Sequence, residues 1–342
     1  MEENKSDTIN ENRNNLNINY SENLKYLNLT SKDLDSIFDV KILGEIISEH
    51  RYNIKQRISC LFQLRSLGSY EAVLALENAL LNEPFSDLLR HEICYVFGQM
   101  IDNEKNIQEI ERFLNVEIFD KPEKWASIVL HEAAEALGNI SNGNNLELLK
   151  RFADYKDDII KETCELAFAN VEWLNKTEKG KTEGLDPEGD CRMYNSNDPA
   201  PPFNYHLDKN YSEINYLRKI LFEDDLFNKY RVLFTLRNLA TDEAVGLMCE
   251  CFNDKFTPLF KHEVAFVLGQ MAKTASKALT KLEQVLQDEN ENSIVRHETA
   301  LALGEIAEGK ELLEKYSTHK DQLVAESCII ATEFVDFWKD CC

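Results

Sequence analysis

The sequence contains few residues that interrupt helices, with 12 glycines and 7 prolines among 342 residues. This scarcity favours helices over a turn-rich β architecture. No run reaches the roughly 18 apolar residues that a membrane-spanning helix needs, and the amino-terminal segment has no apolar core of a secretory signal. The nine cysteines are odd in number and include no Cys-x-x-Cys pair. We therefore expect a cytoplasmic protein with reduced thiols, without a disulfide framework or structural zinc.

Basic residues are also under-represented, with 38 Lys and Arg against 61 Asp and Glu and a net charge of −23. A nucleic-acid-binding protein would show a basic patch, so we expect no nucleic-acid partner. An acidic surface would instead attract a cationic protein or an amine substrate. Solubility alone explains the same charge, and composition does not decide between these two interpretations.

Histidine is scarce, with seven residues in the chain, yet four of these begin the same motif. Each is followed by glutamate, then by an apolar run that ends in glycine seven residues after the histidine. The four copies are His91-Glu92 to Gly98, His131-Glu132 to Gly138, His262-Glu263 to Gly269, and His297-Glu298 to Gly304.

The two halves of the chain can be aligned on these motifs. Leu61 to Gly68 matches Leu233 to Ala240, and the Glu-Thr-Cys sequence ending at Cys164 matches the Glu-Ser-Cys sequence ending at Cys328. Each half holds four units at a spacing of about 30–40 residues, which is the period of helical-pair solenoids. The sequence therefore predicts an all-α repeat protein of two pseudo-symmetric halves with four helix pairs each. Segments such as 69–81 and 276–286 are expected to form helices between the motifs.

Composition divides the chain further. Residues 1–25 are polar and rich in asparagine, so we expect a disordered extension. The glycines and prolines between Gly180 and Pro202 mark a linker that would let the second half face the first. We predict an N-terminal repeat half at 26–175, a linker at 176–212 and a C-terminal repeat half at 213–342.

The spacing within each motif places the histidine opposite the packed face of its helix. At 100° per residue, positions +2, +5, +6 and +9 lie on the other side, and in the third copy these are Val264, Val267, Leu268 and Met271. The glycine at +7 returns to within about 20° of the histidine. We expect it to leave the histidine face unobstructed.

The repeated His-Glu pair is typical of a metal site with nitrogen and oxygen ligands. A single histidine is more often a surface residue, and a glutamate in the first helical turn can serve as a cap. Four identical copies in two pairs favour two metal ions. The zinc-protease spacing and the Glu-x-x-His spacing of four-helix di-iron proteins are both absent. Imidazole with carboxylate and open positions is the ligand set of non-haem iron.

These motifs, together with the Glu-[Ser/Thr]-Cys sequence in each half and the Asp198 to Pro202 linker, resemble the deoxyhypusine hydroxylase family over about residues 55–335. The resemblance implies a HEAT-like superhelix. It also implies an O2-dependent monooxygenase that hydroxylates a deoxyhypusine side chain on the precursor of eukaryotic initiation factor 5A, yielding hypusine. Two Fe(II) ions per chain would lie between the halves, so that a monomer suffices.

The resemblance also implies a role for each motif residue. Glu92 and Glu263 would bind the amines of the substrate, and no catalytic residue is implied beyond the metal centre. The family has methionine three residues before the last motif histidine, where this chain has Ile294, so the substrate channel is expected to differ in shape. The implied iron ligands are His91, His131, Glu132, His262, His297 and Glu298.

Three other functions fit parts of the pattern. A non-catalytic HEAT scaffold would carry the His-Glu pairs as repeat consensus, and metal analysis would test it. A HEAT-like lyase acting on a protein-bound pigment would bind that pigment. A dinuclear zinc or manganese hydrolase would not depend on O2.

Overall fold

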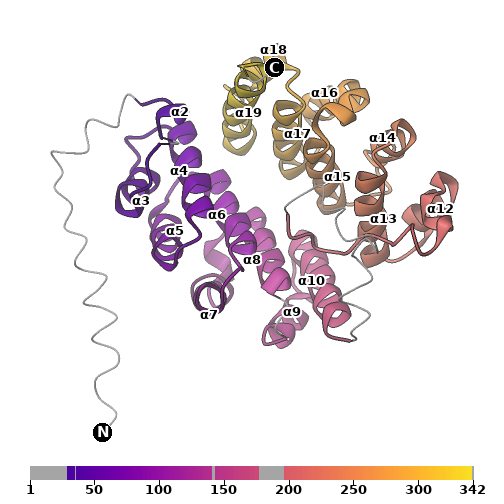
Figure 1. Cartoon of the computed structure of the whole chain (residues 1–342), viewed down its shortest axis with the longest axis horizontal. Helices are drawn as coiled ribbons and strands as arrows, with labels where there is room; N and C mark the ends of the chain where they lie inside the picture. Colours follow the sequence, from indigo (N-terminus) through magenta and orange to yellow (C-terminus); the bar gives the residue numbers. More distant parts are fainter. Residues whose placement is uncertain (1–28, 35, 141–142, 177–195, 341–342) are drawn as a thin grey trace, which may run out of the picture.

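The computed structural model describes residues 29–34, 36–140, 143–176 and 196–340, and within these ranges every regular element is helical (Figure 1). The expected extension at 1–25 and residues 177–195 of the expected linker lie outside the described residues. The division at 26, 176 and 213 stays a prediction. No described helix is long and apolar enough to span a bilayer.

The N-terminal half contains four helix pairs, preceded by the short helix α2. In each pair, the second helix belongs to an inner layer in which α4, α6, α8 and α10 contact one another in order. The bounds are α2 (Ser31–Leu34), α3 (Val40–Ser48), α4 (Ile54–Leu67), α5 (Tyr70–Asn82), α6 (Asp87–Gln99), α7 (Glu104–Phe113), η2 (Leu114–Phe119), η3 (Pro122–Lys124), α8 (Ser127–Ile140), α9 (Leu146–Phe152) and α10 (Asp158–Lys176).

The C-terminal half repeats this arrangement, with α13, α15, α17 and α19 as its inner layer. Both halves thus confirm the predicted HEAT-like pairs. The bounds are η4 (Lys209–Ser212), α12 (Ile214–Glu223), α13 (Leu226–Leu239), α14 (Asp242–Cys249), α15 (Pro258–Gln270), η5 (Ala272–Ala278), α16 (Leu279–Gln287), α17 (Ser293–Glu305), α18 (Lys310–Tyr316) and α19 (Gln322–Asp340).

The two example helices differ in how closely they follow the prediction. The segment 69–81 forms α5, with Ser69 as its N-cap. The segment 276–286 starts in the 3-10 turn η5, and the α-helix begins only at Leu279. The six described cysteines are free thiols, as expected from their place in apolar helix patterns.

The motif glycines do not leave the histidine face open, so that expectation was wrong. Each lies against an alanine of the next inner helix: Cβ atoms added at Gly98 and Gly269 would lie 3.1 Å from the Cα atoms of Ala136 and Ala302. A Cβ at Gly304 would lie 2.8 Å from Cα of Ala331. The glycines therefore allow successive inner helices to approach closely, which brings their histidines together.

The halves meet at two junctions. At one junction α19 contacts α4 and α6, and at the other α10 contacts α13 and α15. The described end of the linker adds a bridge. Asn197 donates to the carbonyl of Gly98 at 3.2 Å, while Ser196 accepts from Gln270 at 2.9 Å. The linker thus bonds to the ends of motif helices from both halves.

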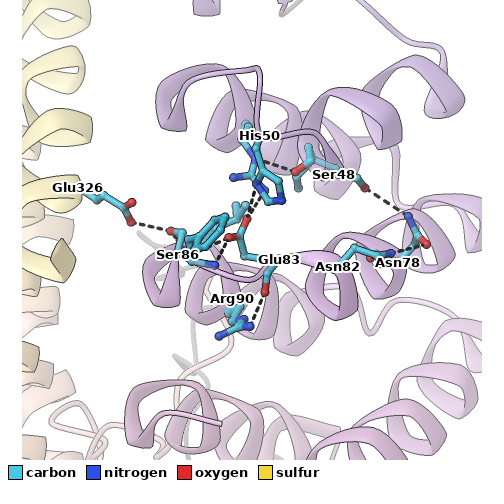
Figure 2. Close-up of polar contacts among 12 residues, drawn as sticks. Ser48, His50, Asn78, Asn82, Glu83, Ser86, Arg90 and Glu326 are labelled. Atoms are coloured by element: carbon cyan, nitrogen blue, oxygen red, sulfur yellow. Dashed lines mark hydrogen bonds and ion pairs between the residues drawn. The ribbon is translucent and has the colours of Figure 1, made fainter. Parts of the chain in front are cut away.

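The first junction ties the start of α6 to the C-terminal half. The hydroxyl of Ser86 caps α6 by accepting from the N–H of Leu89 at 3.0 Å, and it donates to Glu326 of α19 at 2.6 Å (Figure 2). The carboxylate of Glu83 supports this turn by accepting from the N–H of Ser86 at 2.8 Å and from Arg57. The helix that carries His91 is therefore held in position relative to α19.

Candidate metal centre

Each motif histidine lies past the first turn of its helix, because each helix begins four residues earlier. The starts are Asp87, Ser127, Pro258 and Ser293. Where a capping side chain accepts from the first turn, it is Ser86 in α6, Thr257 in α15 and Asn292 in α17. The capping interpretation of the motif glutamates is therefore wrong.

The structure brings all four imidazoles together in the centre of the molecule. Within the N-terminal half, the ring centroids of His91 and His131 are 5.9 Å apart, and within the C-terminal half those of His262 and His297 are 5.2 Å apart. Across the halves, His91 lies 5.1 Å from His297, and His131 lies 5.1 Å from His262. All four side chains are buried.

One carboxylate in each half lies against two of these rings. Oε2 of Glu132 is 3.1 Å from Nε2 of both His91 and His131. Oε2 of Glu298 is 3.6 Å from Nε2 of His262 and 3.7 Å from Nε2 of His297. Two atoms bound to one metal at about 2.1 Å lie roughly 3.0–3.4 Å apart at octahedral or tetrahedral angles. The first trio matches this spacing, and the second trio is slightly wider.

Hydroxyl groups on α10 and α19 fix the tautomers of two histidines. Oγ1 of Thr163 donates to the carbonyl of Ile159 at 2.8 Å, so it accepts from Nδ1 of His131, 3.2 Å away. Ser327 donates to the carbonyl of Leu323 and lies 3.4 Å from Nδ1 of His297. With the proton on Nδ1, Nε2 keeps its lone pair for a metal ion.

The Nε2 atoms that face the centre make no hydrogen bonds, although each of the four lies within 4 Å of a carboxylate oxygen. Nε2 of His91, His131 and His297 and both nitrogens of His262 are buried without a hydrogen-bond partner. A buried polar group of this kind is costly unless a ligand satisfies it. Donor atoms lie within 4.8 Å of one another in three trios: His91-His131-His262, His262-His297-Glu298 and His131-Glu132-Glu135. His262 thus also belongs to a trio that crosses between the halves.

The two halves differ in charge. Burial alone would lower the pKa of His91, but Glu132 raises it to about 10, and the pKa of Glu132 is held well below its usual range. Burial and the neighbouring imidazoles lower the pKa values of His262 and His297. Burial raises the pKa of Glu298 to about 8. A divalent cation that bound both trios would therefore release protons.

A cavity of about 320 Å³ opens beside the imidazoles. Its lining includes Glu92 and Glu263, the two glutamates expected to bind substrate. Oε1 of Glu92 lies 3.3 Å from Nδ1 of His91, whereas Oε1 of Glu263 has no hydrogen-bond partner. Ile294, where the channel was expected to differ, is buried and does not line this cavity. The carboxylates and apolar side chains that line the cavity suit an alkyl chain that carries amines.

Sequence reasoning missed several residues here. Thr163 and Ser327 belong to the Glu-[Ser/Thr]-Cys sequences, but nothing in these sequences indicated that the hydroxyls contact His131 and His297. Glu135 is in the second motif but lacks a counterpart in the other copies. A helical projection places Glu135 one turn beyond His131, on the same face, and this was the available signal.

The fold and the site together define a helical-repeat protein whose halves enclose a buried cluster of imidazoles and carboxylates. No family model matches the chain. A deoxyhypusine hydroxylase of Danio rerio is 37% identical over 310 residues, covering 87% of this chain and 92% of that protein. One of Schizosaccharomyces pombe is 39% identical over 294 residues, covering 83% and 86%.

A solved structure agrees with these relatives. Human deoxyhypusine hydroxylase in complex with glycerol matches with a TM-score of 0.74 and 32% sequence identity, covering 87% of this chain and 96% of that chain. The chain belongs to the deoxyhypusine hydroxylase family, and the resemblance noted in the sequence is confirmed. This membership makes the chain an enzyme and disfavours the scaffold and lyase interpretations.

Proposed function

We propose that this chain hydroxylates a deoxyhypusine side chain on the precursor of eukaryotic initiation factor 5A, using O2 and two Fe(II) ions. The observation that supports this most directly is the convergence of four buried imidazoles from both halves. Membership of the family supplies the substrate class.

The residues present fit a pair of metal ions. We assign His91, His131 and Glu132 to one ion and His262, His297 and Glu298 to the other. Two histidines with one carboxylate and open positions are typical of non-haem iron oxygenases. Iron bound here would supply the activation of O2.

The protein's own contribution is position and shielding. Thr163 and Ser327 orient His131 and His297 through Nδ1, which keeps Nε2 directed at the centre. Burial of the four rings keeps bulk water from the reacting atoms. We assign no acid or base beyond the metal centre.

The substrate-binding role falls to Glu92 and Glu263, at equivalent places in the two halves. Deoxyhypusine is a lysine side chain extended by an aminobutyl group, so it carries a secondary and a primary amine. Carboxylates in a partly buried cavity form strong charge-assisted hydrogen bonds with such groups. Holding both amines would fix the four-carbon segment between them over the metal centre.

The partner is a protein, and the acidic charge of −23 suits a basic region around the modified lysine. The two halves together provide both trios, so the proposal requires one chain. The monomeric state and the cytoplasmic location stay predictions.

The proposal is tested by incubating iron-loaded protein with the deoxyhypusine-bearing precursor under isotopically labelled O2. We expect mass spectrometry to find one labelled oxygen atom on the modified side chain, and none with metal-free protein. Turnover without O2, or with zinc or manganese in place of iron, would contradict the proposal and favour the hydrolase interpretation.

A further inference from the structure

The cavity wall is not symmetric one helical turn beyond the metal-facing residues. The residue four positions after each motif histidine lines the cavity in all four helices. Tyr95 of α6 and Phe266 of α15 are equivalent, and their rings are 6.0 Å apart. Glu135 of α8 is equivalent to Leu301 of α17. A carboxylate in one half therefore faces the cavity where the other half has an apolar side chain.

Glu135 has no cation beside it. Its carboxylate forms no hydrogen bond or ion pair with any residue that the structure describes. Burial and the negative charges of Glu132, Glu263 and Asp198 raise its pKa well above the usual value. The one arginine lining the cavity, Arg65, acts instead on Tyr95, whose pKa burial raises and Arg65 lowers.

Glu263 also lines the cavity, and its charge acts on Glu135. It is 3% exposed and its Oε1 has no hydrogen-bond partner, although Arg237 is close enough to lower its pKa. Asp198, by contrast, is paired with Arg237, and Glu132 lies against two imidazoles. Glu135 and Glu263 are thus two carboxylates on the cavity wall that form no ion pair with any residue that the structure describes. Such a pair is costly to bury unless a cation binds there.

Glu92 has different surroundings from Glu263. Glu92 is the equivalent of Glu263, and it already lies 3.3 Å from Nδ1 of His91. Burial raises the pKa of Glu298 most, and the negative charge of Glu92 raises it further. Leu301 follows Glu298 by one helical turn and makes the wall apolar there, and the next carboxylate on this helix, Glu305, already accepts from Nε1 of Trp338.

We propose that Glu135 sets the direction in which the substrate side chain lies, by binding the terminal primary ammonium together with Glu263. A primary ammonium has three N–H donors and suits two carboxylates. The secondary ammonium has two donors and a methylene group on each side, which suits Glu92 beside Leu301. This inference rests on the proposed function, and it makes Glu135 a specificity-determining residue that neither the motif pattern nor the equivalent helix indicates.

The test is a double-mutant cycle between Glu135 and each amine of the substrate. Dissociation constants are measured without O2 on iron-loaded wild type and Glu135→Gln, with three forms of the precursor. One form carries deoxyhypusine, one has the terminal amine replaced by methyl, and one has the internal amine replaced by methylene. Glu305→Gln is the matched control, because Glu305 also lines the cavity but accepts from Nε1 of Trp338 at 3.1 Å.

We expect loss of the terminal amine to weaken binding by about 10- to 100-fold in wild type and in Glu305→Gln. In Glu135→Gln the same change should cost only a few-fold, whereas loss of the internal amine should cost as much as in wild type. Iron content and melting temperature of Glu135→Gln should equal those of wild type.

Three results would overturn the inference. Equal losses in wild type and Glu135→Gln would remove Glu135 from the site, and coupling to the internal amine would reverse the direction. Loss of iron in Glu135→Gln would make Glu135 a metal ligand. Failure of the proposed function would look different, because wild type itself would then neither bind the precursor nor add oxygen to it.

Discussion

The two halves of the molecule present equivalent residues to the centre but different residues to the cavity. His91, His131 and Glu132 correspond to His262, His297 and Glu298, and both sets meet at the centre. One turn further along, the N-terminal half has Tyr95 and Glu135 where the C-terminal half has Phe266 and Leu301. The symmetric layer suits two like ions, and the asymmetric layer suits an organic chain with two different ends.

The largest effect should come from removing one histidine in either half. We expect His91→Ala and His262→Ala to abolish both iron content and turnover, because each removes a ligand of the proposed pair. Elemental analysis and the oxygen-transfer assay measure this, with the exposed His206→Ala as control. Retention of all the iron in both variants would contradict the assignment of these histidines as ligands, and loss of iron in only one variant would show that the halves are not equivalent.

The substrate glutamates should separate binding of iron from binding of substrate. We expect Glu92→Ala to keep its iron and to bind the precursor about 10- to 100-fold more weakly, because a charge-assisted hydrogen bond is lost. Glu263→Ala, the equivalent change, should also keep its iron. Normal affinity of Glu92→Ala for the precursor would remove its proposed role.

The hydroxyls behind the histidines should have intermediate effects. We expect Thr163→Val to lower iron affinity by about 10- to 100-fold, because Nδ1 of His131 loses its acceptor. Ser327→Ala should have a smaller effect, since its contact with His297 is 3.4 Å against 3.2 Å for Thr163. Iron titration measures both. Thr163→Ser should restore affinity, and a Thr163→Ser variant as weak as Thr163→Val would contradict the role of the hydroxyl.

The smallest effect concerns helix packing. Gly304→Ala should lower the free energy of unfolding by about 1–3 kcal/mol, because its Cβ would meet the backbone of Ala331 at 2.8 Å. Gly138→Ala should do the same in the other half against Ala167. Gly246→Ala is the control: nothing lies within 4 Å, and we expect a gain of about 0.5–1 kcal/mol. Denaturant unfolding that found Gly304→Ala as stable as wild type would contradict the close approach.

The sequence predicted the fold and singled out the four clustered histidines because both are repeated. Periodicity gave the helix pairs, four His-Glu copies gave the histidines, and the family resemblance implied which glutamate of each half joins them. The glycine at +7 was misinterpreted because a helical projection gives the direction of a residue but not its neighbour. Gly98 lies on the same face of its helix as His91, yet Ala136 of the adjacent helix occupies the space where a side chain of residue 98 would lie.

The rest of the site depends on contacts between segments far apart in the chain. Thr163 and Ser327 contact their histidines because α10 packs against α8 and α19 packs against α17. The spacing of residues in the sequence does not give the distance between these helices. The bond from Ser86 to Glu326 joins residues 240 positions apart. Glu135 occurs in one motif of four, so a comparison of the motif copies passed over it.

The central claim is that donors from both halves hold one pair of iron ions. X-ray absorption at the iron edge, measured on protein loaded with two equivalents of Fe(II), tests it most directly. We expect nitrogen and oxygen ligands at about 2.1 Å and a second iron at roughly 3.5–4 Å. Iron without an iron neighbour at that distance would contradict it.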